Sequence, residues 1–248
     1  MNWKDIIVFI STFTLFIPVI LVIVLKLYRS KCFVALAVYY FMDLSFNLMN
    51  ENYIPVSDNF RRVFGITTNL LEFPLMILFV SYFSFSPVLT KRLRYSILGI
   101  ILFELIIVLI LGFNRKSMTI IMAPELGLLL FLCVWFTLRH IRIAVIQNKG
   151  LAKASMITSL LFAYGSYTII YIFFYILDSQ EIKDIFKLYY FTSTFSTLVL
   201  STGIFFESKR IKKLEELKLT RRELNNLYSK SQPATSMSFN TRTPGKSL

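Results

Sequence analysis

Acidic side chains interrupt four strongly apolar stretches of this 248-residue sequence. They are Asp43, Glu72, Glu104 and Glu125. With a helical rise of about 1.5 Å per residue, each acid lies roughly 12 Å below the same end of its predicted helix. Carboxyl groups at such a depth can bind a cation, hold or transfer a proton, or hydrogen-bond to a neighbouring helix. The sequence therefore predicts a layer of four acids at one level of a helical bundle.

Such a layer has a high energetic cost in a membrane. A charged carboxylate near the bilayer centre costs roughly 2.5 to 3.5 kcal/mol, so four unpaired ones would cost about 10 kcal/mol. No Lys or Arg is expected at this level. The acids must therefore share protons, bind a cationic ligand or a metal, or reach solvent.

Local neighbours distinguish the four acids. Asn47 lies one helical turn from Asp43, and Asn69 lies one turn from Glu72, so each pair can form a hydrogen bond on one helix face. Asp43 and Glu72 are the leading candidates for a ligand or proton site, and the alternative is a structural hydrogen bond between helices. For the other two acids, a structural bond to each other across a tight turn is the favoured interpretation.

Polar residues of three other predicted helices are expected at the same level. They are Ser11, Thr14, Thr168, Tyr171, Tyr189, Tyr190, Ser193, Thr194 and Thr197. The opposite half of each helix is drier, which predicts a water-accessible cavity that opens outward and is closed by apolar packing toward the cytoplasm. Tyr171, Ser193 and Thr197 complete the set of candidate ligand- or proton-binding residues. Most of the many Phe and Tyr residues are assigned to lipid-facing surface and interfacial belts, and no cofactor is expected.

Composition identifies the broad class of protein. Apolar residues make up 56% of the chain, and the mean hydropathy is +0.64, well above that of soluble proteins. The 27 basic residues outnumber the 14 acidic ones. In a membrane protein such an excess sets orientation and contacts lipid headgroups, so nucleic acid is not an expected partner. Cys32 and Cys133 have no His or Cys at metal-ligand spacing, and no metal site is expected.

Seven apolar runs predict an all-α bundle of seven membrane-spanning helices within residues 1–206. The runs cover residues 6–28, 32–49, 64–85, 95–113, 117–138, 154–177 and 185–206. Basic residues concentrate in the odd-numbered connections and after the last run, which predicts an outside N-terminus and a cytoplasmic C-terminus. With no N-glycosylation sequon, we expect a multi-pass protein of a bacterial inner membrane. Pro18, Pro74 and Pro124 should kink their helices.

The segment 207–230 predicts a basic amphipathic helix after the last span. Its apolar face holds Ile211, Leu214, Leu217, Leu224 and Leu227. One interpretation is a juxtamembrane helix that contacts anionic headgroups through Lys209, Arg210, Lys212 and Lys213. The other is a parallel coiled coil, with a partner or a second copy, that relays a signal, although Lys218 and Arg221 interrupt its heptads. Residues 231–248 lack an apolar period, so we expect them to be disordered.

Several seven-helix classes are excluded by missing residues. The last run has no lysine between Leu188 and Phe206 for a retinal Schiff base, and the Asp-Arg-Tyr and Asn-Pro-x-x-Tyr motifs of G-protein-coupled receptors are absent. His140, the single histidine, is expected on the cytoplasmic side, which disfavours intramembrane zinc hydrolases. The stretch NLLEF, residues 69–73, resembles a set of uncharacterised bacterial seven-helix integral membrane proteins. This resemblance implies a fold and a location but no activity.

Three functions are consistent with these patterns. The leading prediction is a sensor of a ligand or of protons that relays its state through the C-terminal helix. The alternative is an intramembrane enzyme or carrier acting on a lipid or isoprenoid, with Asp43 and Glu72 as general acid and base. A third is a structural subunit that docks a partner protein.

Overall fold

The computed structural model describes residues 3–147, 150–173 and 185–231. The elements are α1 (Trp3–Thr14), α2 (Phe16–Val24), η1 (Leu27–Arg29), α3 (Lys31–Asn50), α4 (Asp58–Val80), η2 (Ser81–Phe83), α5 (Pro87–Leu111), α6 (Arg115–Gln147), α7 (Leu151–Tyr171) and α8 (Ile185–Ser231). No strand occurs in these described ranges. The predicted all-α class is confirmed.

Five segments of the described residues are long and apolar enough to cross a membrane. They are Ile6–Val24, Lys31–Asn50, Asp58–Phe83, Pro87–Leu111 and Lys116–Gln147. Helices α7 and α8 fall outside this group, because their Ser, Thr and Tyr side chains lower the local hydropathy. The chain is therefore an all-α protein with several apolar helices suited to multiple membrane spans, and the count of seven stays a prediction.

Proline explains the break in the first span. Helix α1 ends at Thr14 and α2 begins at Phe16. Pro18 has no backbone N–H, so it cannot donate to the carbonyl of Thr14, four residues earlier, and the helix is interrupted there. Pro74 and Pro124 lie inside α4 and α6, which continue on both sides of them. Each of these two prolines leaves one carbonyl without its helical donor.

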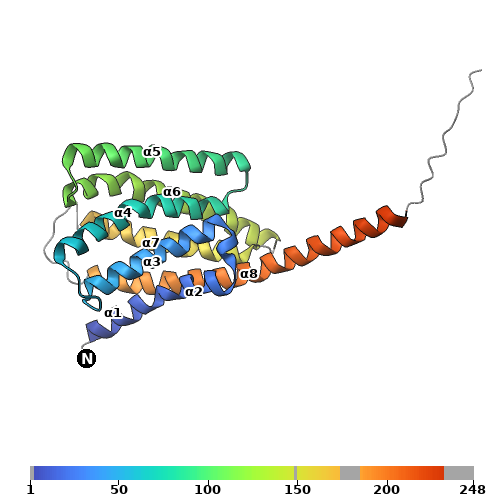
Figure 1. Cartoon of the computed structure of the whole chain (residues 1–248), viewed down its shortest axis with the longest axis horizontal. Helices are drawn as coiled ribbons and strands as arrows, with labels where there is room; N and C mark the ends of the chain where they lie inside the picture. The colour runs from blue at the N-terminus through green and yellow to red at the C-terminus, as the bar shows by residue number, and fades with distance from the viewer. Residues whose placement is uncertain (1–2, 148–149, 174–184, 232–248) are drawn as a thin grey trace, which may run out of the picture. The chain divides into compact units, whose positions relative to one another are not determined.

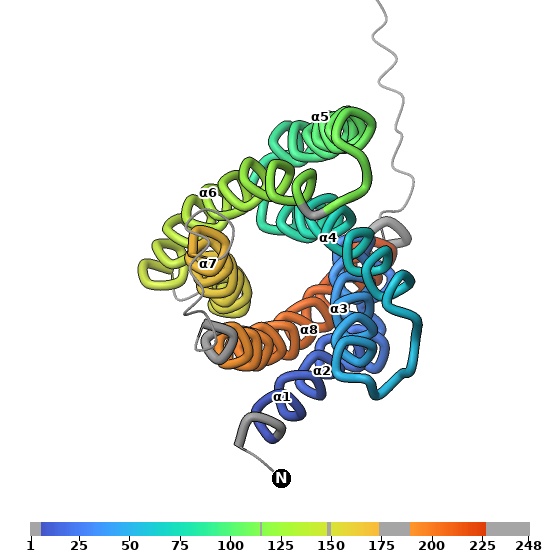
Figure 2. The backbone as a smooth tube through the Cα atoms, turned by 90° about the vertical axis from the view of Figure 1, so that its left-hand side faces the viewer, coloured from blue at the N-terminus to red at the C-terminus, as the bar shows by residue number. Residues whose placement is uncertain are grey.

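The helices of residues 3–208 are arranged around a common centre (Figures 1 and 2). Helices α3, α4, α6, α7 and the first part of α8 form the inner ring. Helix α5 packs outside it against α4 and α6, and α2 packs against α3. The inner-ring helices therefore supply the side chains that can meet at the centre.

Some helices begin well before the apolar runs that predicted them. Helix α5 begins at Pro87, after the Ser86 hydroxyl accepts a hydrogen bond from Leu89 N at 3.2 Å. The basic residues Lys91, Arg92 and Arg94 therefore lie in the first turns of α5 and not in a loop. Hydropathy marks the lipid-crossing part of a helix, whereas capping decides where the helix begins.

The basic C-terminal segment continues the last helix. Helix α8 runs without interruption from Ile185 to Ser231. Residues 207–230 are therefore helical, as predicted, but they belong to the same helix as the residues before them. The chain divides into two compact units, Met1–Ser208 and Lys209–Leu248. Every residue from 212 to 226 is exposed. Disorder is predicted for residues 231–248; Ser231 is the last residue of α8, and residues 232–248 lie outside the described residues.

A close approach of α7 and α8 gives a test of this packing. A Cβ at Gly203 would lie 2.5 Å from Met156 Cγ and 3.2 Å from the carbonyl oxygen of Ala152. We expect Gly203→Ala to lower the melting temperature of the purified protein in detergent, since overpacking costs about 1 to 3 kcal/mol. Gly127→Ala is the matched control, because a Cβ there meets nothing within 4 Å. Equal melting temperatures for the two variants would contradict the close contact between α7 and α8.

Candidate functional site

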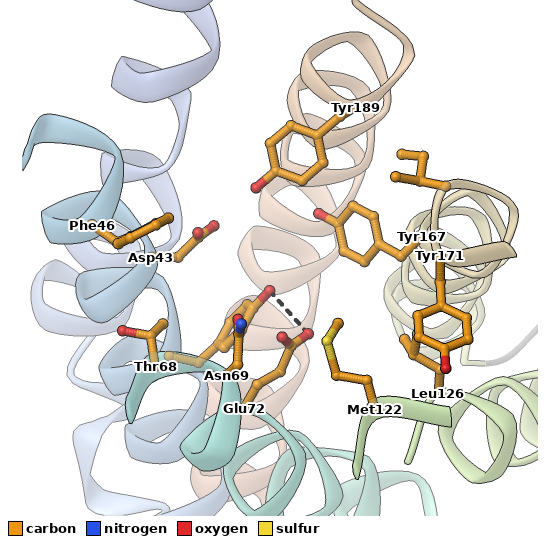
Figure 3. Close-up of a pocket in the computed structure, with 12 residues that line it drawn as sticks. Asp43, Phe46, Thr68, Asn69, Glu72, Met122, Leu126, Tyr167, Tyr171 and Tyr189 are labelled. Atoms are coloured by element: carbon orange, nitrogen blue, oxygen red, sulfur yellow. Dashed lines mark hydrogen bonds between the residues drawn. The ribbon is translucent and has the colours of Figure 1, made fainter. Parts of the chain in front are cut away.

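A cavity of about 170 Å³ lies at the centre of the helix ring (Figure 3). Five helices contribute to its wall: α3, α4, α6, α7 and α8. The lining residues are Tyr39, Asp43, Phe46, Thr68, Asn69, Glu72, Met122, Leu126, Tyr167, Ile170, Tyr171 and Tyr189. It contains two of the four predicted acids, and both point into it (Figure 3).

The cavity lies toward one end of the bundle, which we call the cavity end. At this end α3 and α7 terminate, while α4, α6 and α8 begin. The opposite halves of the same helices, the apolar end, carry large side chains that are almost completely buried. They are Phe33, Phe79, Phe83, Phe136, Met156, Ile157, Leu200 and Ile204. The same half also buries polar side chains, namely Thr137, His140, Ser201, Glu207 and Ser208. The closure of the cavity by apolar packing alone, and which end faces outward, therefore stay predictions.

Glu72 connects three helices through its carboxyl group. Its Oε1 accepts a hydrogen bond from the hydroxyl of Tyr164 on α7 at 3.0 Å and a longer one from Tyr39 on α3 at 3.5 Å. Tyr164 is almost completely buried. The predicted bond between Asn69 and Glu72 is not formed in the described structure. Asn69 lines the same cavity instead, and tyrosines from other helices supply the donors.

Asp43 is held by a residue on its own helix. The side-chain amide of Asn47 donates to Asp43 Oδ1 at 3.4 Å, one turn along α3, as the spacing predicted. Asp43 retains accessible surface, and Figure 3 shows its carboxyl directed toward the open centre of the cavity. Asn47 is thus a support for the cavity wall, whereas Asp43 is part of the wall.

Glu104 on α5 and Glu125 on α6 form a second acidic pair. They are only 7% and 5% exposed, and their carboxyl groups lie close enough to interact. Neither Oε1 receives a hydrogen bond from a described residue. Because carboxylate oxygens only accept, a bond between the two groups needs one shared proton. Glu125 also lines a small space beside the main cavity together with Asn69 and Glu72.

The remaining predicted site residues lie in or next to the cavity. Tyr171 is in its wall, and its hydroxyl donates to the carbonyl of Thr119 on α6 at 2.7 Å. Ser193 and Thr197 line a second small space that also borders Asp43. The structure thus brings the predicted residues of the bundle close together, and their role in binding stays a prediction. Exposed positions in the second compact unit hold Lys209, Arg210, Lys212 and Lys213.

Sequence reasoning did not assign three tyrosines to the site. Tyr39 and Tyr164 bond Glu72, and Tyr167 packs on Tyr189 with ring centroids 5.6 Å apart. The apolar runs around them predict lipid-facing or interfacial positions instead. One available signal was the spacing of Tyr39, which lies one turn from Asp43 on the same face of α3. Another was the spacing 164, 167 and 171, which places three tyrosines on one side of α7.

The cavity wall has a distinct electrostatic character. In the part of the chain that the structure describes, its lining includes no Lys, Arg or His. Among the residues that the structure describes, no three His, Cys, Asp or Glu side chains are grouped as metal ligands would be. His140 lies at the apolar end, where its Nε2 is 3.0 Å from the carbonyl oxygen of Phe83. The two cavity carboxyls therefore have no cationic protein group beside them in the wall.

Comparisons with known proteins do not assign a family to the chain. No match was found among protein-family profiles, curated proteins or solved structures. The resemblance carried by NLLEF stays a prediction, and the functional argument depends on the geometry of the cavity.

The two hydrogen bonds to Glu72 differ in length, which gives a second test. We expect Tyr164→Phe to destabilise the protein by about 0.6 to 1.7 kcal/mol, the average and the maximum measured for interhelical hydrogen bonds in a membrane protein. Tyr39→Phe should cost less, because its bond is at the limit of hydrogen-bonding distance. Chemical or thermal unfolding in detergent measures both. A larger loss for Tyr39→Phe would contradict the geometry around Glu72.

Proposed function

We propose that this protein is a seven-span sensor of a bacterial inner membrane that binds a small ligand or protons in its acidic cavity and relays the bound state through α8. The observation that carries the proposal is that α8 is one continuous helix from the cavity to the basic C-terminal segment. This single helix contributes Tyr189 to the cavity wall and continues to Ser231, beyond the end of the bundle unit at Ser208.

Charge distribution supports the orientation in this proposal. Basic residues of the apolar end include Lys91, Arg92, Arg94, Arg139 and Lys153, and the basic stretch of α8 follows that end in the chain. Glu51 and Asp58 lie at the cavity end. Since Lys and Arg near span ends favour the cytoplasmic side, the apolar end would face the cytoplasm and the cavity would open outward.

Contacts of α8 support a relay. Ser193 and Thr197 border the small space next to Asp43, and further along the same helix Glu207 accepts a hydrogen bond from the Tyr82 hydroxyl at the apolar end. Membrane and interface helices switch between packed states by shifts of about 1 to 2 Å. Occupancy of the cavity can thus change the packing of α8, and a continuous helix carries that change past Ser208.

An enzyme or carrier for lipids or isoprenoids is the second candidate. One observation favours it, which is that Asp43 and Glu72 face the same cavity, as a general acid and base would. The described lining residues include no Lys, Arg or His, so among them a phosphorylated substrate would lack a cationic partner for its phosphate. A subunit that only docks a partner would use neither carboxyl.

A break in the exposed part of α8 tests the relay. The double variant Glu215→Gly and Glu216→Gly should abolish signalling, because each glycine weakens a helix by about 1 kcal/mol relative to alanine. The matched control, Glu215→Ala with Glu216→Ala, removes the same charges but keeps the helix. The measurement is the transcript profile of a deletion strain complemented with each variant, compared with the wild-type gene.

The outcomes separate the candidate functions. A sensor loses its response with the glycine pair and with Asp43→Asn, but not with the alanine pair. An enzyme or carrier loses its effect with Asp43→Asn alone. A docking subunit keeps its effect in all three variants. Melting temperatures close to that of the wild type establish that each variant is folded.

A further inference from the structure

The two cavity carboxyls define the charge of a matching ligand. Asp43 and Glu72 face the same cavity. The ion pair between Arg61 and Asp58 does not involve either of them. Among the described residues, the lining offers an anionic ligand no Lys, Arg or His. A positively charged ligand gains charge-assisted hydrogen bonds in a site of low dielectric constant.

Aromatic residues favour an organic cation over a hydrated metal ion. The wall includes Tyr39, Phe46, Tyr167, Tyr171 and Tyr189. An ammonium group within about 6 Å of an aromatic ring centroid is attracted by the negative face of the ring, and tyrosine hydroxyls can also accept hydrogen bonds from it. Among the described residues no cluster offers a metal the oxygen-rich coordination it requires.

The volume limits the size of the ligand. A cavity of about 150 Å³ in another protein accommodates benzene, so the space of about 170 Å³ here suits a ligand of similar or slightly larger size. A small alkylamine or a compact quaternary ammonium ion fits this limit. A lipid with two acyl chains or a peptide does not.

Beside the cavity, one carboxyl oxygen of Glu125 has no donor, although the same carboxyl group interacts with that of Glu104. Glu125 is 95% buried, since only 5% of its surface is exposed, and its Oε1 receives no hydrogen bond from a described residue. It lines the space next to the cavity with Asn69 and Glu72. A native buried acceptor without a donor is costly, and a donor supplied by a ligand or its bound water would satisfy it.

We propose that the cavity binds a small organic cation with one ammonium centre, between the carboxyls of Asp43 and Glu72 and the rings of Tyr167 and Tyr189. This inference rests on the proposed role of the cavity as a ligand site, and it names the chemical class of that ligand.

Titration calorimetry on the full-length protein in dodecyl maltoside tests the class. The probes are isoamylamine, which is protonated at pH 7, and choline, with isoamyl alcohol as the neutral molecule of the same shape as isoamylamine. We expect at least one cation to bind about tenfold more tightly than the alcohol, the gain typical of a charge-assisted hydrogen bond. Equal affinity for all three, or binding of none, would overturn the proposal.

Variants locate the binding. Asp43→Asn keeps the oxygen that Asn47 contacts and should weaken cation binding by about tenfold or more, as should Glu72→Gln. Asp58→Asn is the matched control: its side chain is 99% exposed at the same end of the bundle, and it should bind like the wild type. If Asp58→Asn weakens binding as much as Asp43→Asn, the attraction is a general surface effect and the proposed site is wrong.

The two proposals can fail independently. If neither cation binds but the glycine pair in α8 still abolishes the response, the proposed sensor function is retained and the proposed ligand class is wrong. If a cation binds as expected and the glycine pair has no effect, the proposed cation site is retained and the proposed relay through α8 is wrong.

Discussion

The requirement that carboxyl groups inside a membrane find partners organises this structure. Lipid offers no hydrogen bonds, so each acid must be satisfied by protein, water or ligand. Glu72 obtains two donors from α3 and α7, and Asp43 obtains one from its own helix. The two bonds to Glu72 tie α4 to α3 and α7 near the centre of the ring. The space left between them is the cavity, so the feature that holds the bundle together also creates its candidate site.

Depth along the helix axis was predictable from the sequence, because the helical rise is nearly constant. Counting residues from the predicted span ends was enough to identify Asp43 and Glu72 as neighbours at the cavity, and Glu104 and Glu125 as a pair. The Asp43 and Asn47 contact also followed from spacing alone, since it lies within one helix.

The side of each helix that faces the bundle centre was much harder to predict than the position of a residue along the helix axis. A tyrosine in an apolar run has the same signature whether it faces headgroups or the bundle centre, so Tyr39, Tyr164 and Tyr167 were not assigned to the site. Asn69 and Glu72 share a helix face, yet Glu72 is bonded by tyrosines from two other helices. Helix ends were likewise set by local caps such as Ser86 and not by hydropathy. Contacts between helices need the packed structure, which a single sequence does not specify.

The packing of the apolar end has an electrical consequence. Phe79, Phe83 and Phe136 are almost completely buried in the halves of their helices opposite the cavity, together with Met156 and Leu200. Aromatic and aliphatic side chains offer water no hydrogen bonds, so this packing disfavours a continuous line of water between the cavity and the opposite end of the bundle. Under the proposed arrangement, an ion that enters the cavity would leave by its entrance. In a bilayer, a bundle closed in this way would admit a charge without dissipating the voltage across the membrane.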